Sequence, residues 1–175
     1  MYFAIKTFNL KINKLLIITF LFSSSIIFSQ DYNYIYDDVK RIPNKKYISI
    51  NELHNTIVKP YYNDIEKVYA FAKFITDKIA YGKRARTPLN TINTMEGVCQ
   101  DYSELFKELC EISSIENNYV AGMGTTNSSL IGEYDSNHAW NVVKVNGKYM
   151  IFDLTWAAGY GEGDAFVRRF NPKYF

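Results

Sequence analysis

The sequence predicts an α+β fold in which amphipathic helices pack on an antiparallel sheet. Apolar residues recur at steps of three and four after Asn63, and again after Cys99, which is the spacing of helices with one core-facing side. The dipeptide Asn146-Gly147 separates two runs rich in β-forming residues, and this is the strongest short signal for a β-hairpin. The helical part therefore comes first in the chain and the sheet follows it.

The first 29 residues have the three-part pattern of a secretory signal peptide. Lysines at positions 6, 11 and 14 precede an apolar run over 15–22, and Ser29 is a small residue at the expected cleavage point. The run is shorter than the roughly 20 residues of a transmembrane helix, so a retained anchor is the less favoured alternative. We expect a secreted, periplasmic or cell-surface protein, cleaved near Ser29 and without a stable membrane span afterwards.

The charge balance does not indicate nucleic-acid binding. The 175 residues include 20 Lys and Arg against 18 Asp and Glu, and the signal peptide removes three lysines and no acidic residue. The remainder is close to neutral, which argues against the basic surface that nucleic-acid binding requires. We interpret 30–62 as a lead-in and 63–175 as one domain, which is long enough to bury a core.

Weaker signals divide the rest of the chain. Residues 30–47 are rich in tyrosine and show no clear period, so we expect them to be extended. A short helix is predicted for 49–58, and the longer helix that starts at Asn63 or Asp64 carries its apolar stripe to Ile79. The other predictions are a loop over 81–93, a strand over 119–124, a loop over 125–136, hairpin strands over 138–145 and 148–156, and a loop over 157–164.

Both cysteines are predicted to be free thiols. Cys99 and Cys110 lie eleven residues apart on one expected helix, hence about 16 Å apart, whereas a disulfide requires Cα atoms within about 7 Å. Cys110 is expected to be a packing residue. Cys99 follows the flexible Gly97 and starts the helix, where unpaired N–H groups and the helix dipole favour a thiolate. Cys99 is therefore either a nucleophile or an ordinary small buried residue.

The hairpin places a histidine beside a carboxylate. A two-residue turn at positions 146 and 147 sets the register, so that the numbers of opposite residues sum to 293. Since side chains alternate along a strand, His138 and Asp153 point to the same face as diagonal neighbours. A slip of one residue would separate them.

Cys99, His138 and Asp153 form the triad for which the sequence supplies geometry. A cysteine nucleophile needs a base, and the base needs a partner that fixes its tautomer. The other histidine, His54, lies in a polar helical segment with no carboxylate held opposite, so we interpret it as a surface residue. The same triad could ligate zinc, but a structural zinc site needs four ligands with close cysteine or histidine pairs. We expect no metal and no cofactor.

These residues lie in motifs that resemble the transglutaminase-like superfamily, cysteine enzymes with a papain-like core. The motifs are Gly97-Val98-Cys99-Gln100-Asp101-Tyr102, His138-Ala139-Trp140-Asn141 and Asp153-Leu154-Thr155-Trp156. The chain looks most similar to the kyphoscoliosis-peptidase-like branch, which its ending over 168–175 also resembles. The resemblance covers about 64–175 and implies a papain-like/transglutaminase-like core with the nucleophile helix packed on the sheet.

The resemblance also implies roles. Cys99 would be the nucleophile, His138 the general base and then acid, and Asp153 the orienting carboxylate. The oxyanion hole would use the Cys99 backbone N–H and one side-chain donor, for which Tyr81 is a candidate by analogy. Members of this branch usually continue beyond the point where this sequence stops, so we expect a chain truncated at its C-terminus.

Three functions remain open at this stage. The favoured one is an exported enzyme that hydrolyses peptide or amide bonds of a protein or peptide substrate through a thioester. The second is amine transfer to protein glutamine, which cross-links proteins and uses the same residues. The third is a non-catalytic binding or scaffold module of a surface protein. The sequence identifies neither the substrate nor the oligomeric state.

Overall fold

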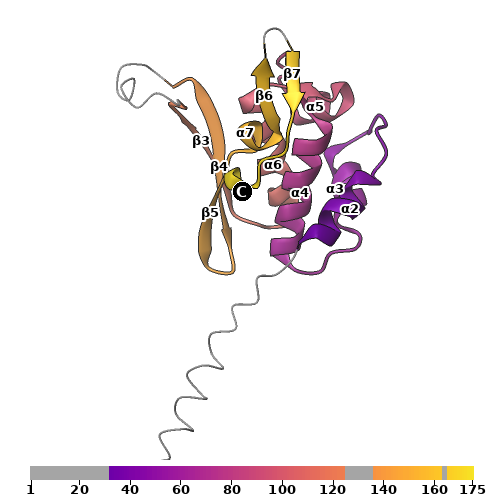
Figure 1. The fold of residues 1–175 in the computed structure, drawn as a ribbon. Coiled ribbons are helices and arrows are strands. Elements are labelled where there is room, and N and C mark those ends of the chain that lie inside the picture. The colour runs from indigo at the N-terminus through magenta and orange to yellow at the C-terminus, as the bar shows by residue number, and fades with distance from the viewer. Residues whose placement is uncertain (1–31, 125–135, 163–164) are drawn as a thin grey trace, which may run out of the picture. The chain divides into compact units, whose positions relative to one another are not determined.

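A central helix, α6 (Cys99–Ile112), lies between a three-stranded antiparallel sheet and a group of further helices (Figure 1). The computed structural model describes residues 32–124, 136–162 and 165–175. Helix α6 buries Tyr102 and Phe106 completely and contacts both α4 (Asp64–Lys78) and the central strand β4 (His138–Val145). The predicted α+β class, with this helix packed on the sheet, is confirmed.

Helix α4 follows its sequence signals. Asn63 is the N-cap, and its side chain accepts a hydrogen bond from the Glu66 N–H at 2.9 Å, which satisfies one of the free donors at the helix start. Phe71 and Phe74 are fully buried. The predicted start and apolar stripe of this helix are confirmed.

Two shorter helices, α2 (Asn33–Lys40) and α3 (Ile50–Val58), pack on α4. The prediction of α3 is confirmed, with Ser49 as its N-cap. The extended structure predicted for 30–47 is wrong over α2, because Ile35 and Val39 are both buried one helical turn apart. That four-residue spacing is a helical signal that the tyrosine-rich composition obscured.

His54 is buried, and the prediction of a surface histidine is wrong. Its side chain is on α3 and only 7% exposed, and its Nε2 lies 2.7 Å from the Ser113 Oγ at the end of α6. Its ring centroid is 5.5 Å from that of Phe71. Since Ser113 lies fourteen residues after Cys99, this contact is about 21 Å from the thiol along the helix. His54 therefore joins α3 to α6 and cannot act as a base on Cys99.

Replacing His54 with alanine should lower the free energy of unfolding by about 2 kcal/mol, because a buried ring and its hydrogen bond are lost. Burial lowers the pKa of His54 from its usual 6.5. The unfolded chain therefore takes up this proton at a higher pH than the folded protein, and the histidine costs stability as the pH falls through 6.5. Urea denaturation at pH 8 and pH 5.5 should show a smaller acid loss in the variant. Equal stability of both proteins would contradict this role.

The stretch predicted as a loop over 81–93 contains a helix, α5 (Pro88–Thr94). The Thr87 hydroxyl accepts a hydrogen bond from the Asn90 N–H, and Pro88 occupies the first helical position. A threonine cap followed by proline is a known helix start. The prediction of a loop is therefore wrong over 88–93.

Helix α5 connects two short strands, β1 (Ala80–Tyr81) and β2 (Glu96–Gly97), which pair in parallel. The pairing sets Tyr81 opposite Gly97. The backbone of Tyr81 thus lies beside Gly97, which is two residues before the start of α6. In the sequence Tyr81 is 18 positions from Cys99.

The sheet has the order β3–β4–β5, with β3 spanning Asn117–Gly122 and β5 spanning Lys148–Phe152. Strands β4 and β5 pair from Val145 with Lys148 to Asn141 with Phe152. These pairs have the predicted register, so the hairpin prediction is confirmed up to Phe152.

Beyond Phe152 the prediction of a strand to position 156 is wrong, because helix α7 (Leu154–Ala158) begins there. Asp153 is its N-cap and accepts a hydrogen bond from the Trp156 N–H at 3.1 Å. Aspartate is among the best N-cap residues, so the local signal for a helix start was present in the sequence.

A second hairpin follows α7. Strands β6 (Gly159–Glu162) and β7 (Ala165–Arg168) are antiparallel. The loop predicted over 157–164 is therefore wrong over the end of α7 and over β6, and its last two residues lie outside the described residues. A short 3₁₀ helix, η2 (Pro172–Tyr174), then packs on α7. The loop predicted over 125–136 lies, except for its last residue, outside the described residues. Among the described helices, each is too short or too polar to cross a bilayer.

Candidate active site

Cys99 is the first residue of α6, as the sequence predicted, and its side chain is half-buried. Its turn is held by Asp101, which is 1% exposed and accepts hydrogen bonds from three backbone N–H groups. The donors are Ala85, Arg86 and Val98, at 3.0, 2.9 and 2.9 Å. One carboxylate therefore fixes both the preceding loop and the helix start that carries the thiol.

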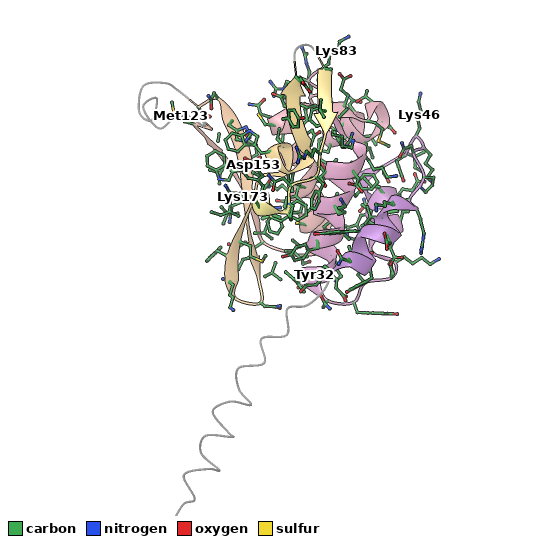
Figure 2. All side chains as sticks on the ribbon, in the orientation of Figure 1. Tyr32, Lys46, Lys83, Met123, Asp153 and Lys173 are labelled. Atoms are coloured by element: carbon green, nitrogen blue, oxygen red, sulfur yellow. The ribbon has the colours of Figure 1, made fainter. Side chains whose placement is uncertain are left out.

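His138 begins β4, and its Nε2 lies 2.7 Å from the Asp153 Oδ2. The two side chains are only 9% and 12% exposed. In Figure 2 the labelled Asp153 lies between the sheet and the helices. The structure thus brings together the histidine and the carboxylate that the hairpin register predicted, even though Asp153 follows the last paired residue.

The two oxygens of Asp153 have different partners. Oδ2 meets His138, while Oδ1 accepts from the Trp156 N–H and caps α7. Trp156 lies in the first turn of α7, and its ring stacks on that of His138, with centroids 4.9 Å apart and planes inclined by 21°. The imidazole is therefore fixed at one nitrogen by a carboxylate and on one face by an indole.

Cys99 and His138 are in contact, and each changes the proton affinity of the other. A side-chain hydrogen bond to His138 lowers the pKa of the Cys99 thiol from its usual 9.0, against an opposing effect of burial. Burial pulls the pKa of His138 down, but hydrogen bonds to Asp153 and Cys99 and their charges raise it to about 9. Because Asp153 engages Nε2, the Nδ1 atom is the nitrogen left to face the thiol. Both shifts, the pKa of the thiol downward and that of the imidazole upward, favour the thiolate–imidazolium form of the pair.

A buried amide joins the strand of His138 to the helix of Cys99. Asn141 is fully buried, and its Nδ2 donates to the Ser103 carbonyl oxygen on α6 at 3.1 Å and to the Asn117 Oδ1 at 2.8 Å. Asn141 lies three residues after His138, and Ser103 lies four residues after Cys99. This contact holds the two elements in register about one helical turn from the reacting pair.

Two tyrosines flank the thiol. Tyr81 is 43% exposed, and burial together with the nearby Cys99 charge raises its pKa. Tyr119 on β3 is half-buried, and its pKa is raised by burial and by the same charge. Both hydroxyls therefore stay protonated and can donate hydrogen bonds. Tyr81 was a candidate by analogy, whereas Tyr119 carried no sequence signal that we recognised.

The second cysteine has no part in this arrangement. Cys110 is fully buried, and burial raises its pKa to about 12, so it is an inert packing residue. Both cysteines are free, as predicted. No group of three or more His, Cys, Asp and Glu side chains suited to a metal ion occurs in the described part of the chain.

Sequence reasoning named Cys99, His138 and Asp153, and the structure places all three together. It missed the functions of Asp101 and Trp156, although both lie inside the motifs that carried the resemblance. Asp101 lies three residues after Val98, the N-cap of α6, and Trp156 lies three residues after Asp153, the N-cap of α7. An acidic residue at that position is a known helix-start signal, and it could have indicated the role of Asp101.

Comparison with known proteins gives consistent relatives. The chain is 28% identical over 141 residues to the kyphoscoliosis peptidases of Mus musculus and Homo sapiens, an alignment that covers 72% of this chain. The chain spans only 21% of the length of these relatives. The periplasmic domain of TgpA from Pseudomonas aeruginosa has a TM-score of 0.52 and 18% identity, with 73% of this chain and 49% of that chain aligned, and so shares the fold.

The family assignment follows from the match over the site itself. The model of the transglutaminase-like superfamily matches residues 51–154, a span that contains Cys99, His138 and Asp153. Together with the similarity to kyphoscoliosis peptidase, this supports the branch that the sequence motifs indicated. The chain belongs to the transglutaminase-like superfamily.

Proposed function

We propose that this protein is a cysteine-dependent acyl-transfer enzyme that hydrolyses peptide or amide bonds of a protein or peptide substrate. The observation that carries the proposal is the coupling of Cys99 to His138 and of His138 to Asp153. Such a chain supplies a nucleophile, a group that exchanges its proton, and a carboxylate that holds that group in place. The name of the peptidase relatives points to the same bond type.

In the first half of the reaction the Cys99 thiolate attacks the substrate carbonyl carbon. A carbon–sulfur bond forms, and the carbonyl oxygen takes the electron pair and becomes an oxyanion. As the oxyanion collapses, the carbon–nitrogen bond breaks, and the His138 imidazolium gives its proton to the departing nitrogen. An amine leaves and a thioester remains.

In the second half His138, now neutral, takes a proton from water. The water oxygen attacks the thioester carbon, the carbon–sulfur bond breaks, and a carboxylic acid leaves as the thiolate–imidazolium pair is restored. A primary amine in place of water would give amine transfer through the same intermediate. The proposal of hydrolysis is tested against this alternative by the fate of the thioester.

The oxyanion would be stabilised at the start of α6. The Cys99 backbone N–H belongs to the first turn, where helix N–H groups have no acceptor within the helix, and the Tyr81 hydroxyl is held beside this turn by the pairing of β1 with β2. The raised pKa of Tyr81 keeps its proton available for donation. These are the two donors that the tetrahedral intermediate requires.

Replacing Tyr81 with phenylalanine should reduce kcat by about 10²-fold and leave KM nearly unchanged, because an oxyanion donor acts on the transition state. The ring and its contacts remain, so the alkylation rate of Cys99 should stay within about twofold of wild type. The same substitution at Tyr119 is the matched control, and it should leave kcat within about threefold. A larger loss at Tyr119 than at Tyr81 would assign the donor to Tyr119 and contradict this role.

We also propose that the enzyme is exported. Support comes from the basic start, the apolar run over 15–22 and Ser29. Expression with and without residues 1–29, followed by fractionation and N-terminal sequencing, tests export. A mature chain that begins near residue 30 outside the cytoplasm supports it, and an uncleaved cytoplasmic chain contradicts it.

The reaction is tested with a mixed peptide library, analysed by mass spectrometry with and without methylamine. New carboxylate termini that depend on Cys99 support hydrolysis, whereas methylamide products at glutamine side chains would replace it with amine transfer. No product of either kind, together with a thiol of ordinary reactivity, would favour a binding module.

A further inference from the structure

An aromatic pocket opens on the histidine side of the candidate active site. It has a volume of about 670 Å³, within the range of small-molecule and peptide subsites. Its wall includes His138 and Tyr81 of the site, Trp156 of α7 and Phe166 of β7. The remaining lining residues are Thr155, Gly159, Tyr160, Gly161, Arg169, Phe170, Asn171 and Tyr174.

The position of this pocket relative to the reacting pair decides which half of a substrate enters it. His138 lines the pocket and Cys99 does not. The acyl half of a substrate becomes bonded to the Cys99 sulfur, whereas the departing amine receives its proton from His138. The pocket is lined by His138 and Trp156, and by Tyr81, whose proposed contact is with the scissile carbonyl oxygen between the two halves. Because His138 delivers its proton to the departing nitrogen, we assign the pocket to the amine half, which is the leaving segment.

The pocket walls favour an aromatic side chain. Trp156 stacks on His138 and meets the Tyr174 ring edge-on, with centroids 5.6 Å apart. The Phe166 ring centroid lies 6.4 Å from that of Tyr81. Rings at these spacings offer edges and faces to an inserted ring. A buried aromatic side chain gains both apolar contact and directed ring contacts there.

The charge at the pocket selects a second feature. Arg169 lines the pocket, and its guanidinium makes no ion pair with any described residue. The backbone of Arg169 is anchored, because its N–H donates to the Ala158 carbonyl oxygen at 3.0 Å, and its side chain is exposed at the pocket. A guanidinium presents a planar fork of donors that matches a carboxylate.

We propose that this pocket binds the leaving segment of the substrate, and that it selects a peptide with an aromatic side chain followed by a carboxylate that pairs with Arg169. The proposal rests on the acyl-transfer function proposed above. It names the substrate class as peptides cut on the N-terminal side of an aromatic residue that lies next to a free C-terminus or an acidic residue.

The test measures binding of leaving-segment peptides to the protein with Cys99→Ala, which cannot turn them over. The probes are the dipeptide Phe-Ala, its C-terminal amide, and Ala-Ala. Fluorescence reports binding, because the chain has two tryptophans and one of them, Trp156, lines the pocket. We expect Phe-Ala to bind at least tenfold more tightly than Ala-Ala and about fivefold more tightly than the amide.

Two substitutions separate the charge from the cavity. Arg169→Gln should remove the preference of the pocket for the acid over the amide. Lys148→Gln removes an equal charge at the turn of the β4–β5 hairpin and should keep that preference. Gly161→Leu should weaken Phe-Ala binding at least tenfold by filling the cavity. A Cβ at Gly161 meets no atom within 4 Å, so Gly161→Ala is the control for the backbone change, and the free energy of unfolding of Gly161→Leu is measured beside its binding.

Equal affinity for all three probes, or an unchanged acid preference in Arg169→Gln, would overturn the pocket proposal. The alkylation rate of Cys99 in the wild-type protein is measured alongside and answers separately for the chemistry. An activated thiol with unselective binding refutes the pocket alone. Selective binding with an ordinary thiol refutes the acyl-transfer function and, with it, the assignment of the peptide as a leaving segment.

Discussion

Replacing Cys99 with alanine should reduce turnover at least 10³-fold, because it removes the thiolate that His138 activates to form the acyl-enzyme. The fold should be retained, since Cys99 is half-buried and alanine suits the first position of a helix. The loss of the thiolate should also lower the pKa of His138 from about 9, because the Cys99 charge and hydrogen bond help to raise it. Turnover is measured with a peptide from the library, and the pKa by NMR titration of the ring.

The matched control for this variant is the other cysteine. Cys110→Ala should leave turnover unchanged and should lower the free energy of unfolding by about 1 kcal/mol, since it removes a buried sulfur from the core. Iodoacetamide should modify one thiol in the folded wild-type protein and none in Cys99→Ala. Residual turnover above about a tenth in Cys99→Ala would contradict the assignment of the nucleophile.

Replacing Asp153 with asparagine should lower turnover by about 10²- to 10⁴-fold with little loss of stability. The amide keeps the shape of the carboxylate and is an equally good helix N-cap, so α7 and the stacked Trp156 stay in place. What is lost is the negative charge on His138. Without it the imidazolium is less stable, the thiolate at Cys99 loses its partner, and the fraction of active ion pair falls.

The pH dependence gives this variant a distinctive signature. In the wild-type protein the thiolate–imidazolium pair exists between the lowered pKa of Cys99 and the raised pKa of His138, about 9. Turnover should therefore fall on the acid side as the thiolate is protonated, and on the alkaline side as His138 loses its proton near pH 9. In Asp153→Asn the alkaline limb should move to lower pH. Asp37→Asn, an exposed carboxylate on α2, is the control, and an unmoved limb in Asp153→Asn would contradict the charge argument.

The sequence predicted the local part of this site well because local chemistry determines it. The Asn146-Gly147 turn sets the register of β4 and β5, and the register alone places His138 near Asp153. The apolar spacing after Cys99 predicted a helix that starts close to this residue, and α6 begins at Cys99. These inferences needed no information about the rest of the fold.

Elements whose residues suit more than one type of secondary structure were harder to predict from the sequence. The prediction continued β5 through Asp153 because its residues suit a strand, whereas the structure uses the aspartate as the cap of α7. The sequence analysis likewise predicts a loop at Pro88, whereas Pro88 is the first residue of α5. Each of these helices has five to seven residues, which is too short to show a helical period of apolar residues. The only local signal for such a helix is its N-cap residue.

The contact between Cys99 and His138 could not be derived from local signals at all. It depends on how α6 lies on β4, which is fixed by buried residues far apart in the sequence, including Asn141 and Ser103. The same is true of the aromatic pocket, whose walls come from β1, α7, β7 and the segment after it. The helix start, the hairpin register and the sequence motifs indicated the three residues of the triad, whereas the residues around them depend on tertiary packing.

The central claim is that His138 activates Cys99, and the most direct measurement is the rate of Cys99 alkylation against pH in the wild-type protein and in His138→Ala. The account predicts a wild-type rate that stays high well below pH 8, and a variant whose rate falls at neutral pH and recovers only as an ordinary thiol ionises, near pH 8.5. Two identical curves centred on that ordinary pKa would contradict it.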